Sequence, residues 1–138
     1  MLRVVFDSNI FVSALAFPGG AADRALAHAL QGRITLLLSE PLLGEVLGVM
    51  GRKFLRDTEE LSRLAVFLTE LAEPIDPRLQ IAALSDEPDN RVLECAVAGR
   101  ADLIVTGDSA MQRLGKFEGV SIIKLRELLH RLERDDRD

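Results

Sequence analysis

The chain has 138 residues, of which 48% are hydrophobic and 28% charged, a composition that fits one globular domain with a sizeable core. No apolar run approaches the ~20 residues of a membrane span, and Met1-Leu2-Arg3 leads straight into a short apolar segment, so we expect a cytoplasmic protein without a signal peptide. The net charge of −5 argues against a protein that coats nucleic acid non-specifically, although an acidic total can hide a local basic groove.

Short runs rich in Val, Ile and Leu alternate with helical patterns along the chain. This alternation predicts an α/β fold with a mostly parallel central sheet and helices on both faces. The predicted strands are Leu2 to Phe6, Ile34 to Leu38, Leu103 to Val105 and Val120 to Ile123. The predicted helices span residues 9–15, 22–31, 40–52, 58–72, 88–99, 109–115 and 125–134. We assign residues 1–130 to a single domain and expect the charged end, residues 131–138, to fray.

Two aspartates lie just after predicted strands, and each precedes a serine at the start of a predicted helix. Asp7 follows Phe6 and precedes Ser8, and Asp108 follows Val105 after Thr106 and Gly107 and precedes Ser109. Aspartate is a good helix N-cap, so either residue alone could be structural. The serine could instead cap the helix and leave the aspartate free. Because the carboxyl ends of parallel strands meet at one edge of a sheet, we expect the two aspartates to lie close together.

Two further acids lie on predicted helices. Glu45 falls at the edge of an apolar face, where the alternatives to a role in a site are an exposed flank or a salt bridge with Arg52. Asp89 falls within the apolar arc of its helix, and its alternative is a capping box with Asp86 as the N-cap. Capping does not require four acids to share one edge of the sheet, whereas a site for a hard divalent cation does.

These acids and their surroundings resemble those of PIN-domain ribonucleases, and the chain is similar to the toxin components of VapC-type toxin–antitoxin pairs. The matching stretches are Val4 to Ser13, Ser39 to Phe54, Asp86 to Ala98 and Ala101 to Asp108. The resemblance implies Mg²⁺ or Mn²⁺ as cofactor and RNA as substrate, with a metal-positioned water attacking the phosphodiester. The ligands and catalytic residues that it implies are Asp7, Glu45, Asp89 and Asp108.

The resemblance implies further roles. Asn9 and Thr106 would give polar support to the ligands. Many relatives carry another acid where this chain has Ala110, and Asp86 is a possible substitute for it. The expected partners are an antitoxin protein and a second copy of the chain in a homodimer.

The chemistry agrees with this reading without the resemblance. Hydrolysis of a phosphodiester requires charge neutralisation on a phosphate oxygen and a deprotonated water, and oxygen-ligated cations supply both. Crowded carboxylates repel one another and therefore favour a bound cation or a retained proton. Other chemical groups are few: Cys95 lies in an apolar pattern and is expected to be a core thiol, whereas His28 and His130 are expected at the surface without a role.

Basic residues follow Glu45 closely. Arg52, Lys53 and Arg56 could flank the site and hold RNA phosphates, or they could form a solvated helix end. Three glycines on the same helix, Gly44, Gly48 and Gly51, indicate close approach by a partner helix, a second subunit or RNA, or else a tolerated defect.

Two other functions compete with a nuclease. One is a catalytically weak RNA- or protein-binding module on the same fold, which would require a lost ligand, and all four acids are present. The other is a phosphotransfer domain or phosphatase with Asp7 as nucleophile. That class prefers a second aspartate where this chain has Asn9.

Overall fold

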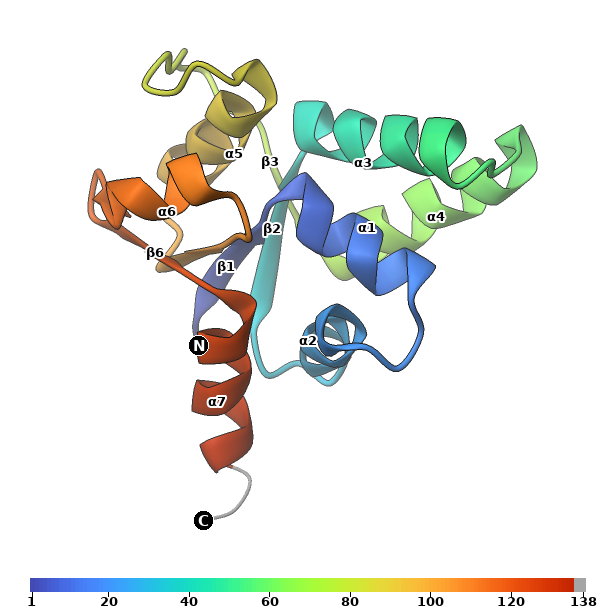
Figure 1. Cartoon of the computed structure of the whole chain (residues 1–138), viewed down its shortest axis with the longest axis horizontal. Helices are drawn as coiled ribbons and strands as arrows, with labels where there is room; N and C mark the ends of the chain where they lie inside the picture. Colours follow the sequence, from blue (N-terminus) through green and yellow to red (C-terminus); the bar gives the residue numbers. More distant parts are fainter. Residues whose placement is uncertain (136–138) are drawn as a thin grey trace.

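The computed structural model describes residues 1–135 and contains a six-stranded sheet with the order β3-β2-β1-β4-β6-β5 (Figure 1). The strands are β1 (Arg3–Phe6), β2 (Thr35–Ser39), β3 (Glu73–Ile75), β4 (Leu103–Val105), β5 (Lys116–Phe117) and β6 (Val120–Ile123). All neighbouring pairs are parallel except β5 and β6, which are antiparallel. The predicted α/β class with a mostly parallel sheet is confirmed.

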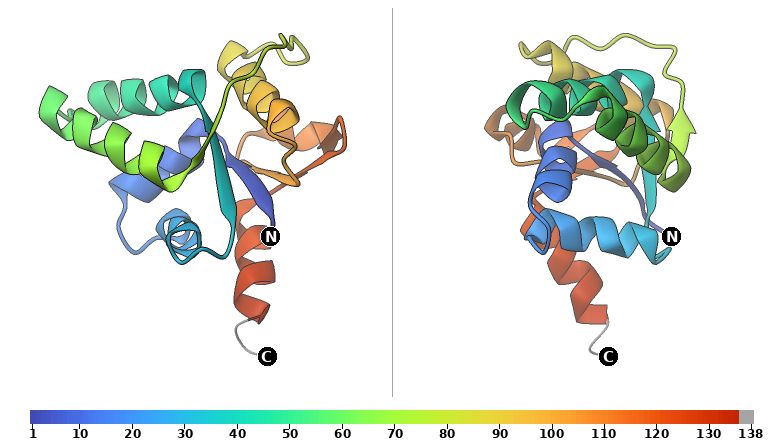
Figure 2. Two further views of the ribbon diagram at one scale, coloured as in Figure 1. Left: turned by 180° about the vertical axis from the view of Figure 1, so that it is seen from behind. Right: turned by 90° about the vertical axis from the view of Figure 1, so that its right-hand side faces the viewer.

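Helices cover the sheet so completely that Val4, Val5 and Phe6 of the central strand β1 have no exposed surface. The helices are α1 (Ser8–Ala16), α2 (Ala21–Leu30), α3 (Glu40–Lys53), α4 (Thr58–Leu71), α5 (Glu87–Ala98), α6 (Ser109–Leu114) and α7 (Leu125–Asp135). Helix α2 packs against both α1 and α7, whereas α5 contacts β1, β2 and β4 (Figure 2). Helices α3 and α4 project together to one side of the sheet (Figure 1). Since neither face of β1 is open, the helices lie on both faces, as predicted.

Every predicted strand and helix is present, with bounds that differ by a few residues. Strands β3 and β5 were not predicted from the sequence. Strand β3 contains Pro74, which lacks a backbone N–H donor and is typical of a break between elements. Strand β5 has only two residues, too few for a periodic pattern.

The C-terminal segment that was expected to fray, residues 131–138, is helical in its first part. Residues 131–135 do not fray but form the last turns of α7, with Leu132 buried. The reason is a contact with α2, because the Arg24 guanidinium lies 2.5 Å from a carboxylate oxygen of Glu133. Residues 136–138, the rest of the expected tail, lie outside the described residues.

The expectation of a surface position for His28 was wrong. Helix α7 covers this side chain, which is only 7% exposed, and its Nε2 lies 3.6 Å from Glu133. His130 is exposed, as expected. Cys95 is a core thiol, and burial raises its pKa to about 11. Within residues 1–135, no helix combines the length and the apolar character that crossing a membrane would require.

The irregular segment before α5 is held in place by polar side chains of that helix. The amide of Asn90, which is fully buried, accepts from the Leu84 N–H at 2.9 Å and donates to the Leu84 carbonyl at 2.8 Å. The Glu94 carboxylate accepts from the Ile81 N–H at 2.8 Å and pairs with Arg91 at 2.7 Å. These bonds satisfy backbone groups that no strand or helix serves, and they fix the start of α5.

We predict that Asn90→Ala lowers the free energy of unfolding by about 1–3 kcal/mol, because it leaves both backbone groups of Leu84 without partners. Urea unfolding measures the loss, and faster hydrogen exchange at the Leu84 amide localises it. Asn9→Ala, which changes an exposed asparagine, is the matched control and should stay within about 0.5 kcal/mol of the parent. Equal stability of the two variants would contradict the role given to Asn90.

Candidate metal centre

Asp7 is a buried carboxylate at the end of the central strand. Its backbone N–H donates to the Val105 carbonyl at 3.1 Å, which continues the pairing of β1 with β4. This register places Asp7 beside Thr106, and the Thr106 hydroxyl donates a short hydrogen bond to Asp7 Oδ2. The other oxygen, Oδ1, accepts from the Ile10 N–H at 2.9 Å and caps α1.

Burial is the main influence on the ionisation of Asp7, and it raises the pKa of this carboxyl above its ordinary value. The hydrogen bonds from Thr106 and Ile10 oppose the rise, whereas the negative charge of Asp108 adds to it. The structure therefore places Asp7 and Asp108 within electrostatic range of each other.

Asp108 occupies the equivalent position after β4. Its Oδ2 accepts from the Met111 N–H at 2.8 Å and caps α6, while its own backbone N–H donates to the Thr106 hydroxyl oxygen at 2.9 Å. The sequence left open whether the aspartates or Ser8 and Ser109 are the caps, and the structure shows that the aspartates are. Each serine is instead the first residue of its helix.

Asp89 lies in the first turn of α5 and is half-buried. Its Oδ2 is buried and has no hydrogen-bond partner within residues 1–135. Burial is the largest cause of a rise in the pKa of Asp89 to about 7. The negative charges of Asp108, Asp86 and Asp7 add to this rise, and so does an interaction between the Asp89 and Asp108 carboxyl groups as hydrogen-bond partners. Four of the acids singled out in the sequence are thus gathered at one edge of the sheet.

Two of the predicted acids hold less central positions. Asp86 is the N-cap residue of α5, but its exposed side chain makes no capping hydrogen bond, so the capping box is not formed. Glu45 on α3 lines a cavity of about 200 Å³ together with Glu87 and Pro88, the two residues that precede Asp89. Glu45 thus faces the first turn of α5. Its charge is not among the causes of the raised pKa of Asp89.

Within residues 1–135, no three His, Cys, Asp or Glu side chains are arranged as a ready ligand shell for a metal ion. Both oxygens of Asp7 and one oxygen of Asp108 accept hydrogen bonds in this arrangement. Each carboxylate oxygen retains a further lone pair for a cation. The donor set therefore fits Mg²⁺ or Mn²⁺, which prefer oxygen ligands, and the unpartnered oxygen of Asp89 adds to this fit.

Comparison with known proteins identifies the family. The family model of the PIN domain matches residues 3–110 of this chain, a range that includes Asp7, Glu45, Asp86, Asp89 and Asp108. The chain belongs to the PIN-domain family. A protein of Methanocaldococcus jannaschii described as uncharacterized is 28% identical over 111 residues, which cover 78% of this chain and 71% of the relative.

Two solved structures have a similar fold. A chain from VapBC2 of Rickettsia felis, solved with a fragment of promoter DNA, aligns with a TM-score of 0.62 and 19% identity over 89% of this chain and 98% of the other. A chain from VapBC-1 of nontypeable Haemophilus influenzae aligns with a TM-score of 0.65 and 16% identity over 91% of this chain and 99% of the other. Family membership, together with the clustered acids, supports a nuclease of PIN type.

Thr106 and Asn9, the two residues predicted to give polar support to the acids, differ in whether they contact them. Thr106 contacts Asp7 and Asp108 directly, as described above. Asn9 is exposed in the first turn of α1, and no hydrogen bond of its side chain is found in residues 1–135. The structure therefore brings Thr106, but not Asn9, into contact with the acids.

The predicted basic group lies farther along α3 than Glu45. Arg52 is seven residues beyond Glu45, about 10 Å along a helix with a rise of 1.5 Å per residue. Its guanidinium folds back over Gly48, where an added Cβ would come within 2.8 Å of Nη1. Lys53 is exposed, and Arg56 pairs with Glu60 at 3.2 Å.

The glycines of α3 are explained in part by contacts within the chain. Gly48 leaves room for Arg52, and Gly51 lies 3.4 Å from Leu61 of α4, measured from the position of an added Cβ. An added Cβ at Gly44 would meet no atom within 4 Å.

The sequence analysis missed two residues that position the centre of the PIN domain. Asn90 fixes the segment before α5, and Gln112 donates from Nε2 to the Thr106 carbonyl at 3.1 Å. The signal for Asn90 was available, because this polar residue shares a helical face with Leu93 and Val97. The contact of Gln112 depends on a turn whose geometry the sequence did not reveal.

We predict that Asp108→Asn leaves the metal-free protein as stable as the parent or more stable. Asparagine keeps an oxygen that can accept from Met111 and removes a negative charge next to Asp89. Asp108→Ala should be less stable than the asparagine variant by about 0.5–2 kcal/mol, because the cap is lost. Urea unfolding in EDTA measures both.

The same pair of substitutions at Asp57 is the control. Asp57 caps α4 through the Glu60 N–H at 2.8 Å and lies outside the acidic centre. Alanine should destabilise there too, but asparagine should give no gain. If Asp108→Asn were as harmful as Asp108→Ala, the repulsion between Asp108 and Asp89 would be refuted as a source of instability.

Proposed function

We propose that this PIN-domain protein is a Mg²⁺- or Mn²⁺-dependent endoribonuclease that hydrolyses RNA phosphodiesters. The observation that carries the proposal is the buried, unpartnered oxygen of Asp89 in the field of Asp7 and Asp108. Such a cluster destabilises its own negative charge, and a bound cation removes this cost. A carboxylate cluster of this kind at strand ends fits metal-assisted hydrolysis better than nucleophilic catalysis.

The residues that would hold the metal are Asp7, Asp89 and Asp108, with Glu45 approaching from α3. A bound Mg²⁺ or Mn²⁺ supplies charge neutralisation at a phosphate oxygen and a more acidic water. The chain itself supplies rigidity. Thr106 fixes Asp7, and helix caps fix one oxygen each of Asp7 and Asp108, so these two carboxylates are held in place before a metal binds.

The toxin of a toxin–antitoxin pair is the biological setting that we propose. The similarity of fold to chains from the VapBC2 and VapBC-1 structures supports this setting. Expression of the chain together with the product of a neighbouring reading frame, followed by co-purification, tests for an antitoxin partner.

We predict that the purified protein cleaves single-stranded RNA in Mg²⁺ or Mn²⁺ and not in EDTA, because carboxylates alone cannot neutralise the charge of the transition state. Replacing Asp7, Asp89 or Asp108 with Asn, or Glu45 with Gln, should lower the rate of RNA cleavage by at least about 100-fold, since each change removes a charged ligand. Asp86→Asn should have a milder effect. Gel assays of a labelled RNA measure the rates.

Asp76→Asn, at an exposed acid outside the centre, is the matched control and should cleave like the parent. Cleavage that persists without metal after repurification would refute the proposed mechanism. Full activity of Asp89→Asn would refute the assignment of Asp89 as a ligand.

We also predict that millimolar Mn²⁺ raises the Tm of the parent, because a ligand that binds only the folded state stabilises it by mass action, by about 2.7 kcal/mol at 100 times Kd. The shift should be much smaller for Asp89→Asn and unchanged for Asp76→Asn. Melting curves in EDTA and in Mn²⁺ measure it. An equal shift in the parent and Asp89→Asn would place the metal elsewhere.

A further inference from the structure

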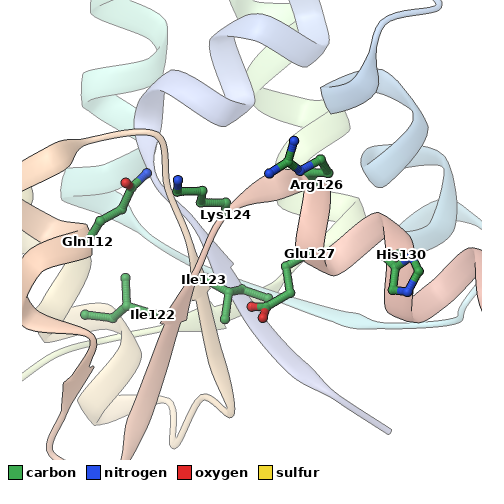
Figure 3. A pocket seen from close by; sticks show the side chains of 7 residues that line it. All are labelled: Gln112, Ile122, Ile123, Lys124, Arg126, Glu127 and His130. Carbon is green, nitrogen blue, oxygen red and sulfur yellow. The ribbon is translucent and has the colours of Figure 1, made fainter.

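A second cavity lies beside the carboxylate centre, between α6 and the beginning of α7. It has a volume of about 500 Å³, and its apolar part is formed by Ile122 and Ile123 at the end of β6. Gln112, Lys124 and Arg126 lie in a row along one side of it, with their polar ends on that side (Figure 3). We call these three residues and this cavity the cation pocket.

The cation pocket is joined to the carboxylate centre through a single residue. The Thr106 N–H donates to the Ile123 carbonyl at 3.1 Å, and the Thr106 carbonyl accepts from Gln112 at 3.1 Å. The hydroxyl of the same threonine donates to Asp7. Thr106 therefore connects the backbone beside the pocket with the Asp7 carboxylate.

The two cations of the pocket have no carboxylate partner in the described part of the chain. Lys124 and Arg126 are exposed, and neither has an ion pair within residues 1–135. Other arginines of the same chain, such as Arg3 and Arg24, lie within 2.6 Å of a carboxylate oxygen. The pocket's own acid, Glu127, has its carboxylate 3.8 Å from Arg131. Free positive charge therefore remains beside an acidic centre, in a chain whose net charge is −5.

We propose that Lys124 and Arg126 bind a backbone phosphate of the RNA strand, one that neighbours the phosphodiester presented to Asp7, Asp89 and Asp108. This inference rests on the proposed function. An acidic centre repels a polyanion, and a strand can approach it only if cations nearby attract the adjoining phosphates. The guanidinium of Arg126 suits two phosphate oxygens at once, and the anchored Gln112 amide offers a further donor. The lining residues are mainly polar and charged, and the one aromatic side chain among them is the exposed imidazole of His130, so the pocket fits phosphate contacts better than a run of stacked bases.

The test compares two double variants with the same change of charge. Lys124→Gln/Arg126→Gln removes the pocket cations. Arg100→Gln/Lys116→Gln removes two exposed cations at the opposite edge of the sheet, where Arg100 precedes β4 and Lys116 pairs with Ser121 at the start of β6. Melting curves establish that both variants are folded.

The binding probe is a fluorescein-labelled single-stranded RNA of mixed sequence in EDTA, with anisotropy measured at several salt concentrations. A single-strand phosphate contact contributes a slope of about 0.7 in log affinity against log salt, and therefore roughly 5-fold in affinity at 0.1 M salt. Because both cations bind the same phosphate, the pocket variant should bind about 5-fold more weakly, with a slope smaller by about 0.7. The control variant should bind with the slope of the parent. In Mn²⁺, the pocket variant should raise KM for RNA cleavage with little change in kcat, because the contact is made in ground and transition state alike.

Each outcome separates this inference from the proposed function. Cleavage by the parent with equal RNA affinity of the pocket and control variants refutes the pocket alone and would favour an acidic protein segment as its occupant. RNA binding that depends on Lys124 and Arg126, without any metal-dependent cleavage, supports the pocket and refutes the nuclease. Absence of RNA binding by the parent overturns the inference.

Discussion

The constraint on which the rest of the structure depends is the burial of the Asp7 carboxylate. A buried charge costs several kcal/mol unless hydrogen bonds replace its water. Here the replacements are the Thr106 hydroxyl and the Ile10 N–H. The first requires β1 and β4 to be neighbours in one register, and the second requires α1 to begin immediately after the strand. Sheet order, helix start and acidic centre are therefore determined together.

The positive ends of three helices make the crowding of acids tolerable. Asp7 and Asp108 cap α1 and α6, and Asp89 lies in the first turn of α5. The N-terminus of a helix carries a partial positive charge and free N–H groups, so it stabilises a nearby carboxylate. This compensation is incomplete at Asp89, whose Oδ2 has no partner in the described chain and whose pKa rises to about 7. The remaining deficit favours a cation at this place.

Local patterns were enough to predict most of the fold and the closeness of Asp7 and Asp108, because apolar periodicity and strand ends are properties of short segments. The place of Asp89 beside them was implied by the family resemblance. The features that were missed depend on contacts between distant segments. His28 is buried only because α7 folds over α2, and the position of Glu45 depends on how α3 packs against α5. The choice of Asp7 rather than Ser8 as the cap depends on where the first helical turn begins, which the sequence left open.

The two outermost strands also limit how this protein can associate with others. An exposed strand with free N–H and C=O groups invites a further strand from another chain. Strand β3 carries Pro74, which cannot donate to such a strand, and β5 has only two residues to offer. Sheet extension across molecules is therefore disfavoured at both borders. A lasting contact with a second copy or another protein is therefore expected to use helix and loop surfaces, where side chains rather than backbone groups determine which partner fits.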